Sequence, residues 1–181
     1  MLHSKLLVAG DKTSAVKVFD VQTKSLLREM KKHSAAVRCC SWSADGLRVY
    51  SGSDDRQAFC WDLATEQVLF STGSGRDSSH KDYIRALDAS SVSPDLFATG
   101  SYDHSVKVWD CRQGSSSSPV ISSIALNHPV QSCMFTPSGT MLLVASGSEV
   151  RVFDLLAGGR LLHCFDNHQK HVTSLCMDGT R

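Results

Sequence analysis

The chain has 181 residues, of which 41% are hydrophobic and 20% charged, the composition of an ordinary globular protein. Its formal net charge of +1 gives no electrostatic basis for binding nucleic acid through charge alone. No run of 18 apolar residues is present, so we expect neither a membrane span nor a secretory signal. The seven cysteines form no Cys-x-x-Cys pair, and we expect reduced thiols of an intracellular protein.

Short apolar runs separated by turn signals follow one another along the chain. The run at residues 5–10 opens the series, and three later units each begin with a first strand and continue into a second. The first strands are expected at Val37–Trp42, Ile84–Ala89 and Val130–Phe135, and the second at Leu47–Ser51, Leu96–Thr99 and Met141–Ala145. A further first strand is expected at Val172–Met177. Four short strands per unit, with no helical period, predict an all-β fold.

One motif recurs at the third strand of each unit. Gly100–Asp110 reads GSYDHSVKVWD, and Gly52–Asp62 reads GSDDRQAFCWD. Two weaker copies end in Phe19-Asp20 and Phe153-Asp154, so the aromatic residues are spaced by 42, 48 and 44 residues. A Trp-Asp signature with this period is typical of a propeller blade.

On these motifs the chain resembles the WD-repeat (WD40) family over nearly its full length. The resemblance implies a WD40 β-propeller, with about four blades' worth of four-stranded antiparallel sheets. Because an open array exposes strand edges, and seven blades are commonest in the family, we expect a fragment of a seven-bladed propeller; a closed four-bladed ring is the alternative. The expected units are a partial blade at 1–32, blades at 33–79 and 80–127, a degenerate blade at 128–167, and the first strand of a further blade at 168–181.

Two blades each contain a hydroxyl side chain, a His, an Asp and a Trp, and the first three of these are the residue types of a hydrolase catalytic triad. In WD repeats such a set is structural, and each is expected to be hydrogen-bonded internally: His33, Ser51 (or Ser53), Asp55 and Trp61 in one blade, and His80, Thr99 (or Ser101), Asp103 and Trp109 in the next. A set that recurs in several blades, without a Gly-x-Ser-x-Gly elbow, does not indicate an active site. We therefore expect that the protein is not an enzyme.

The last blade departs from this pattern. Gly147 stands where the Asp is expected, and Phe153 replaces Trp, so we expect no such network there. His163, Cys164, His168 and His171 suggest a zinc site, but their spacing matches no common structural zinc pattern. No phosphate-binding loop is present either. We therefore expect no metal, no cofactor and no small-molecule substrate.

A closer resemblance rests on longer stretches. Asp82–Arg85, Ser93–His104, Phe135–Gly139, Val152–Leu162 and Asn167–Lys170 are similar to the WD-repeat proteins associated with the U3 small nucleolar RNA. That resemblance implies a non-catalytic scaffold of the nucleolar small-subunit processome. Its partners would be other WD-repeat subunits, with pre-ribosomal RNA and small nucleolar ribonucleoprotein contacted indirectly or weakly. The alternative is a general adaptor, such as a ubiquitin-ligase substrate receptor or a signalling scaffold.

Candidate partner-binding residues follow from the first strands. The position after the opening Val or Ile faces the mouth of the central channel in WD propellers, and here it is Arg38 and Arg85. Tyr83 precedes one arginine and Tyr102 lies in the neighbouring tight turn. Arg and Tyr often anchor interfaces, so these four residues are expected to form a partner-binding patch. The alternative is that the arginines pair with nearby carboxylates.

Overall fold

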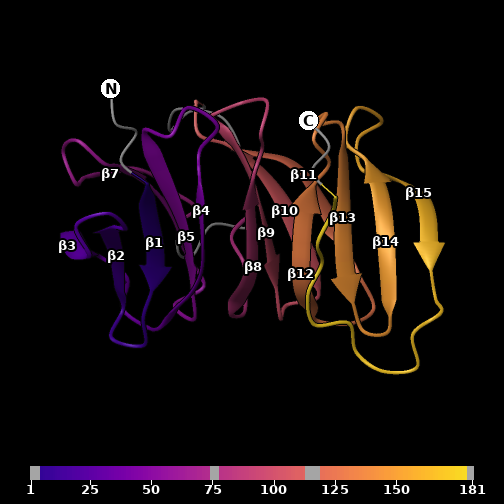
Figure 1. Ribbon diagram of the computed structural model, residues 1–181. Helices are drawn as coiled ribbons and strands as arrows, with labels where there is room; N and C mark the ends of the chain where they lie inside the picture. Colours follow the sequence, from indigo (N-terminus) through magenta and orange to yellow (C-terminus); the bar gives the residue numbers. More distant parts are fainter. Residues whose placement is uncertain (1–4, 74–77, 113–118, 179–181) are drawn as a thin grey trace.

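The computed structural model describes residues 5–73, 78–112 and 119–178 and contains 15 β-strands. Figure 1 shows the strands gathered into four sheets that stand side by side in chain order. All strand pairs are antiparallel, as the short alternating runs predicted. Within these ranges no helix is long and apolar enough to cross a membrane.

The sheets are built from consecutive strands. The first sheet has three, and each later sheet has four, ordered as they follow in sequence. The first sheet comprises β1 (Leu6–Gly10), β2 (Ala15–Asp20) and β3 (Ser25–Lys31). The second comprises β4 (Val37–Trp42), β5 (Arg48–Ser53), β6 (Ala58–Asp62) and β7 (Val68–Ser71). The third comprises β8 (Ile84–Ala89), β9 (Leu96–Ser101), β10 (Ser105–Asp110) and β11 (Val120–Ala125). The fourth comprises β12 (Val130–Phe135), β13 (Met141–Ser146), β14 (Glu149–Asp154) and β15 (Arg160–Phe165).

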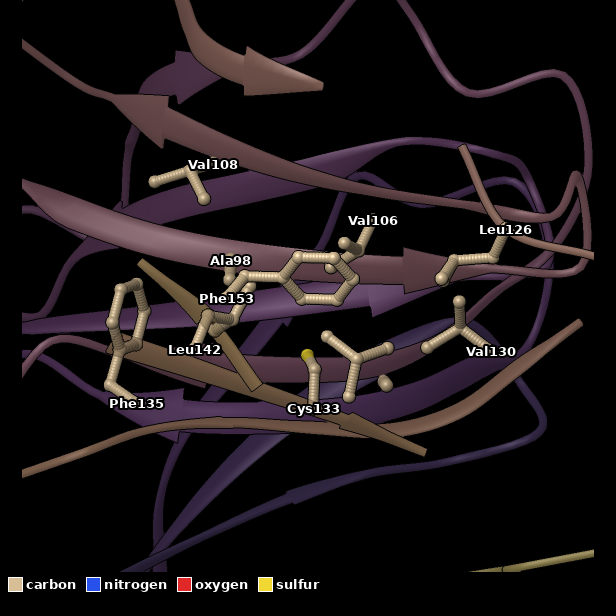
Figure 2. Close-up of a cluster of buried hydrophobic side chains, with 11 residues drawn as sticks. Ala98, Val106, Val108, Leu126, Val130, Cys133, Phe135, Leu142 and Phe153 are labelled. Carbon is tan, nitrogen blue, oxygen red and sulfur yellow. The ribbon is translucent and has the colours of Figure 1, made fainter. Parts of the chain in front are cut away.

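The core lies between neighbouring sheets, because alternate side chains of each strand point to opposite faces. Figure 2 shows the cluster between the third and fourth sheets, to which β10 contributes Val106 and Val108, β13 contributes Leu142 and β14 contributes Phe153. Equivalent clusters fill the other two boundaries, around Trp61 in one and Trp109 in the other. Each sheet is thus held mainly by its sequence neighbours, and the first and last sheets lie at opposite ends of the row (Figure 1).

Glycines allow this close approach of the sheets. A Cβ added at Gly100 of β9 would lie 2.3 Å from Val130 Cγ1, and one at Gly52 would lie 2.7 Å from Ile84 Cγ2. Gly10 faces Val37 in the same way, at 2.4 Å. The first apolar residue of each later sheet therefore occupies the space that a side chain would fill on the sheet before it.

The segment Val172–Met177, expected as the first strand of a further blade, forms no strand within the described residues. The segment runs back beside β12 (Figure 1), where Val172 N–H donates to Gly147 O at 2.8 Å and Leu175 N–H to Ser132 Oγ at 3.2 Å. A strand requires a partner with which to form a ladder, and within the described ranges this segment pairs with none. Residues 179–181, assigned to the same unit, lie outside the described residues.

Candidate interaction surface

β-Bulges place one residue of each first strand outside the hydrogen-bonded ladder. The pairing of β4 with β5 shifts between Val37 and Cys39, and that of β8 with β9 shifts between Ile84 and Ala86. The skipped residues are Arg38 and Arg85. β12 has the same shift, which skips Gln131. A bulge redirects the side chain of its extra residue, so the same local irregularity presents two arginines and a glutamine from three adjacent sheets.

Tight turns between the second and third strands face these bulges. Asp54 and Asp55 lie in the β5–β6 turn, and Tyr102 and Asp103 in the β9–β10 turn. Each turn is hydrogen-bonded to the residue that precedes the first strand of the same sheet. Asp54 N–H donates to Ala36 O, before β4, and Tyr102 N–H donates to Tyr83 O, before β8, both at 2.9 Å. The turns are consequently rigid supports for the side chains that they carry.

The second sheet contains a continuous hydrogen-bonded chain below its turn. Trp61 Nε1–H donates to Ser51 Oγ at 2.8 Å, Ser51 Oγ lies 2.8 Å from His33 Nε2, and His33 Nδ1 lies 2.8 Å from Asp55 Oδ2. The Asp55 carboxylate can only accept, so His33 Nδ1–H donates to it, and in that neutral tautomer Nε2 accepts the Ser51 hydroxyl proton. Ser53 is outside this chain and donates to Ala35 O.

The third sheet repeats the arrangement. Trp109 Nε1–H donates to Thr99 Oγ1 at 2.7 Å, Thr99 Oγ1 lies 2.7 Å from His80 Nε2, and His80 Nδ1 lies 2.8 Å from Asp103 Oδ2. Ser101 instead donates to Asp82 O. Burial by itself would raise the pKa of Asp103, but hydrogen bonds from His80, Ser105 and the Lys81 N–H hold it well below its ordinary value.

The hydroxyl, imidazole and carboxylate are ordered as in a serine hydrolase, but the environment differs. Ser51 and Thr99 are both 0% exposed, and each hydroxyl oxygen is occupied by an indole N–H. A nucleophile has to reach a substrate, which these buried hydroxyls do not. The two networks fix the turns that carry Asp54 and Tyr102.

The fourth and first sheets support their turns differently. The β13–β14 turn is shortened to Gly147 and Ser148, because Ser146 pairs with Glu149, and His128 is exposed beside it. In the first sheet Thr13 stands at the Asp position, and its N–H and hydroxyl bond Asp11 Oδ1, each at 2.8 Å. The structure thus assigns to Asp11 a capping role that the motif comparison did not anticipate.

The surface itself is a chain of contacts across three sheets. Arg38 donates through Nε at 2.8 Å and Nη2 at 2.5 Å to Asp54 Oδ2. Arg85 Nε lies 3.8 Å from the other oxygen of Asp54, and the Arg85 guanidinium carbon lies 5.0 Å from the Tyr102 ring centre. The Tyr102 hydroxyl contacts the Gln131 side-chain amide at 3.3–3.4 Å. Both arginines therefore pair with a carboxylate, as the alternative expected: Arg38 is hydrogen-bonded to Asp54, and Arg85 forms a longer ion pair with it.

Asp54 was missed by the sequence reasoning, although a signal existed. It directly precedes the network residue Asp55, as Tyr102 directly precedes Asp103. Tyr83 completes the surface: its ring centre lies 5.9 Å from the Arg85 guanidinium carbon, and the residue is 44% exposed. The arrangement offers cations, aromatic rings and one carboxylate to a ligand.

Among the described residues, no three His, Cys, Asp or Glu side chains lie close enough together to hold a metal ion. His163 packs edge-on against Phe165, with ring centres 4.4 Å apart, and His168 and His171 are exposed. Asp88, at the other end of β8 from Arg85, accepts the Phe135 N–H at 2.8 Å. Burial raises the pKa of Asp88, and its hydrogen bond joins the third sheet to the fourth.

Comparison with known proteins identifies the repeat. The family model described as "WD domain, G-beta repeat" matches residues 24–62 and 69–110. The chain carries WD40 repeats. A chain in the solved structure titled "Crystal Structure of Mitotic Checkpoint Complex" superposes with a TM-score of 0.80 at 19% identity, covering 93% of this chain and 53% of that one, a likeness in fold alone. The predicted propeller fold class is confirmed.

Curated relatives are more similar in sequence. The U3 small nucleolar RNA-associated protein 15 homolog of Xenopus tropicalis is 42% identical over 176 residues, 97% of this WD-repeat chain. U3 small nucleolar RNA-associated protein 15 of Schizosaccharomyces pombe is 33% identical over 179 residues, 96% of the chain. The chain spans about a third of the length of these relatives, 32% and 34% respectively.

Proposed function

We propose that this WD-repeat chain is a scaffold in ribosome biogenesis, acting in the processing of small-subunit pre-ribosomal RNA and in ribosomal DNA transcription within the nucleolar small-subunit processome. The observation that carries the proposal is the 42% identity to a protein named for its association with the U3 small nucleolar RNA, which extends over 97% of the chain. The same name recurs for relatives from chicken and fission yeast. Other WD-repeat subunits are the proposed partners.

A general adaptor is the second candidate, and the fold alone is equally consistent with this function. WD40 propellers serve unrelated assemblies, so a fold does not define a partner. The structural similarity at 19% identity shows a shared fold and does not indicate a partner. Sequence similarity over almost the whole chain therefore gives the ribosomal proposal the stronger support.

The contact surface proposed for this scaffold contains Arg38, Arg85, Tyr83 and Tyr102. Three of these residues gather around one point, since both tyrosine rings lie within 6 Å of the Arg85 guanidinium carbon. Arg38 joins them through Asp54. Aromatic and arginine side chains in one exposed patch have the character of an interface hot spot.

The experiment that tests the function is co-precipitation of U3 small nucleolar RNA with the tagged chain, combined with imaging of its position relative to a nucleolar marker. Wild-type protein should enrich the RNA and co-localise with the marker. Arg38→Glu/Arg85→Glu should lower the enrichment, whereas Lys5→Glu/Arg160→Glu, an equal charge change at exposed positions elsewhere, should not. Absence of U3 RNA from the wild-type precipitate would contradict the ribosomal proposal and favour the adaptor.

A further inference from the structure

The two arginines of the surface have different environments. Arg38 directs both Nε and Nη2 to one oxygen of Asp54, and this pairing raises its pKa. Arg85 makes no hydrogen bond to any described residue, and its buried Nε has no hydrogen-bond partner. A buried donor without an acceptor is unfavourable. The Arg38 guanidinium is therefore already hydrogen-bonded within the protein, whereas the Arg85 guanidinium has donors that no described residue accepts.

The Arg85 guanidinium is nevertheless held in place. Tyr102 and Tyr83 lie at 5.0 Å and 5.9 Å from its central carbon, within the range of cation–π attraction. The Tyr102 N–H donates to Tyr83 O at 2.9 Å, which ties together the backbone segments that carry the two rings. The Arg85 side chain is 28% exposed while its Nε is buried, so the donors that reach the surface are the two terminal Nη groups of the guanidinium fork. Such a fork matches an oxyanion.

The charge of the surface limits which oxyanion fits. It holds two guanidinium groups and one carboxylate, so a single positive charge remains. One carboxylate neutralises it, whereas a phosphate dianion brings excess charge close to Asp54. Binding an RNA backbone depends on several cations meeting several phosphates, and neither this surface nor the chain's net charge of +1 supplies them.

We propose that Arg85 is the anion-binding residue of this surface and that its ligand is the carboxylate of an acidic side chain in a segment of a protein partner. The exposed Tyr83 ring packs on the residue beside that carboxylate, and the Gln131 amide, positioned by Tyr102, lies at the far side of the site. The inference deepens the proposed scaffold function, on whose partner-binding surface it rests, by naming the chemistry that the partner presents.

The test is a side-chain NMR titration of the 15N-labelled chain, which follows the arginine Nε–Hε resonances. The probes are N-acetyl-glutamate amide, its isosteric control N-acetyl-glutamine amide, methyl phosphate, and a hexamer of uridylate. The glutamate probe should shift the Arg85 resonance saturably while the glutamine probe leaves it unchanged. Arg85→Lys, in which binding is followed on the Arg38 Nε–Hε and Tyr102 backbone amide resonances, should weaken the glutamate probe at least about fivefold, because a lysine keeps the charge but loses the planar fork. Arg151→Lys, whose guanidinium pairs with Glu149 at 2.6 Å, is the matched control and should bind as wild type.

Three outcomes would overturn the inference. The first is no saturable shift at Arg85, and the second is equal binding by Arg85→Lys. The third is tighter binding of methyl phosphate or the uridylate hexamer, which would assign the site to phosphate or RNA. The titration contains no ribosomal component, so its failure is distinguishable from failure of the U3 co-precipitation, which would contradict the scaffold proposal instead.

Discussion

Asp54 Oδ1 lies 3.8 Å from Arg85 Nε, and both atoms are buried without a hydrogen bond. The carboxylate is close enough to compensate the guanidinium charge, yet it is turned toward Arg38, to which its other oxygen is bonded. Asp54 thus acts as a counter-ion shared between two sheets. It lowers the positive potential at Arg85 without occupying its donors.

Asp54→Asn should accordingly strengthen anion binding at Arg85. Removal of the Asp54 charge, whose interaction with Arg85 is worth up to about 1 kcal/mol, should raise the affinity for N-acetyl-glutamate amide about two- to fivefold. The Arg85 resonance in the NMR titration measures this change. Asp45→Asn, at an acidic residue outside the surface, is the control and should leave the affinity unaltered.

The hydroxyl of Thr99 should be required for the stability of the third sheet. Thr99→Val preserves the shape but orphans Trp109 Nε1–H and His80 Nε2, which both lie 2.7 Å from the hydroxyl. We expect a loss of about 1–3 kcal/mol for each orphaned group, measured by urea denaturation. Thr99→Ser keeps the hydroxyl and should lose only about 1 kcal/mol from the missing methyl group. Equal costs for both variants would contradict the network.

Acid should destabilise the chain through the network carboxylates. Hydrogen bonds from the histidines overcome burial and hold the pKa values of Asp103 and Asp55 below their ordinary value in the folded state. A lowered folded-state pKa stabilises the protein above the unfolded pKa, and this contribution is lost as the pH falls below it. The free energy of unfolding should therefore drop from about pH 5 to about pH 3, with a shallower slope in Asp103→Asn. An unchanged slope in that variant would exclude Asp103 as a source of the effect.

Gly100 should not tolerate a side chain while Val130 is present. Its added Cβ would lie 2.3 Å from Val130 Cγ1, so Gly100→Ala should cost about 1–3 kcal/mol through overpacking. Val130→Ala alone should cost about 2 kcal/mol through the cavity that it leaves. In the double variant the two changes complement each other, and the loss should be smaller than the sum by about 1 kcal/mol. Additive losses would place the two residues out of contact.

Local sequence predicted the strands well. β4, β8 and β12 have the expected bounds, because each is an apolar run followed by a turn signal. The second strands differ by one or two residues, since β5 begins at Arg48 and β9 ends at Ser101. The segment Val172–Met177 has the same local character but no ladder. A strand depends on its partner, which a local pattern does not reveal.

The surface was less predictable than the strands. Repetition of the motif named the members of the two networks, and the first-strand positions named Arg38 and Arg85. The role of Asp54 depends on how closely the second and third sheets approach, and that spacing is set by Ile84 filling the space at Gly52. Contacts between sheets of this kind are determined by packing, not by the spacing of residues in the sequence.

The bulge at the start of each first strand has an evolutionary consequence. Its extra residue is skipped in the ladder pairing, so the side chain at this position is constrained mainly by its contacts with the neighbouring turns, such as those of Arg38 and Arg85 with Asp54. Arg38, Arg85 and Gln131 already differ in chemistry at equivalent positions of one chain. An exchange at one of these positions alters surface contacts and leaves the ladder pairing in place, so each bulge offers a position at which a repeat can change the chemistry that it presents to a ligand.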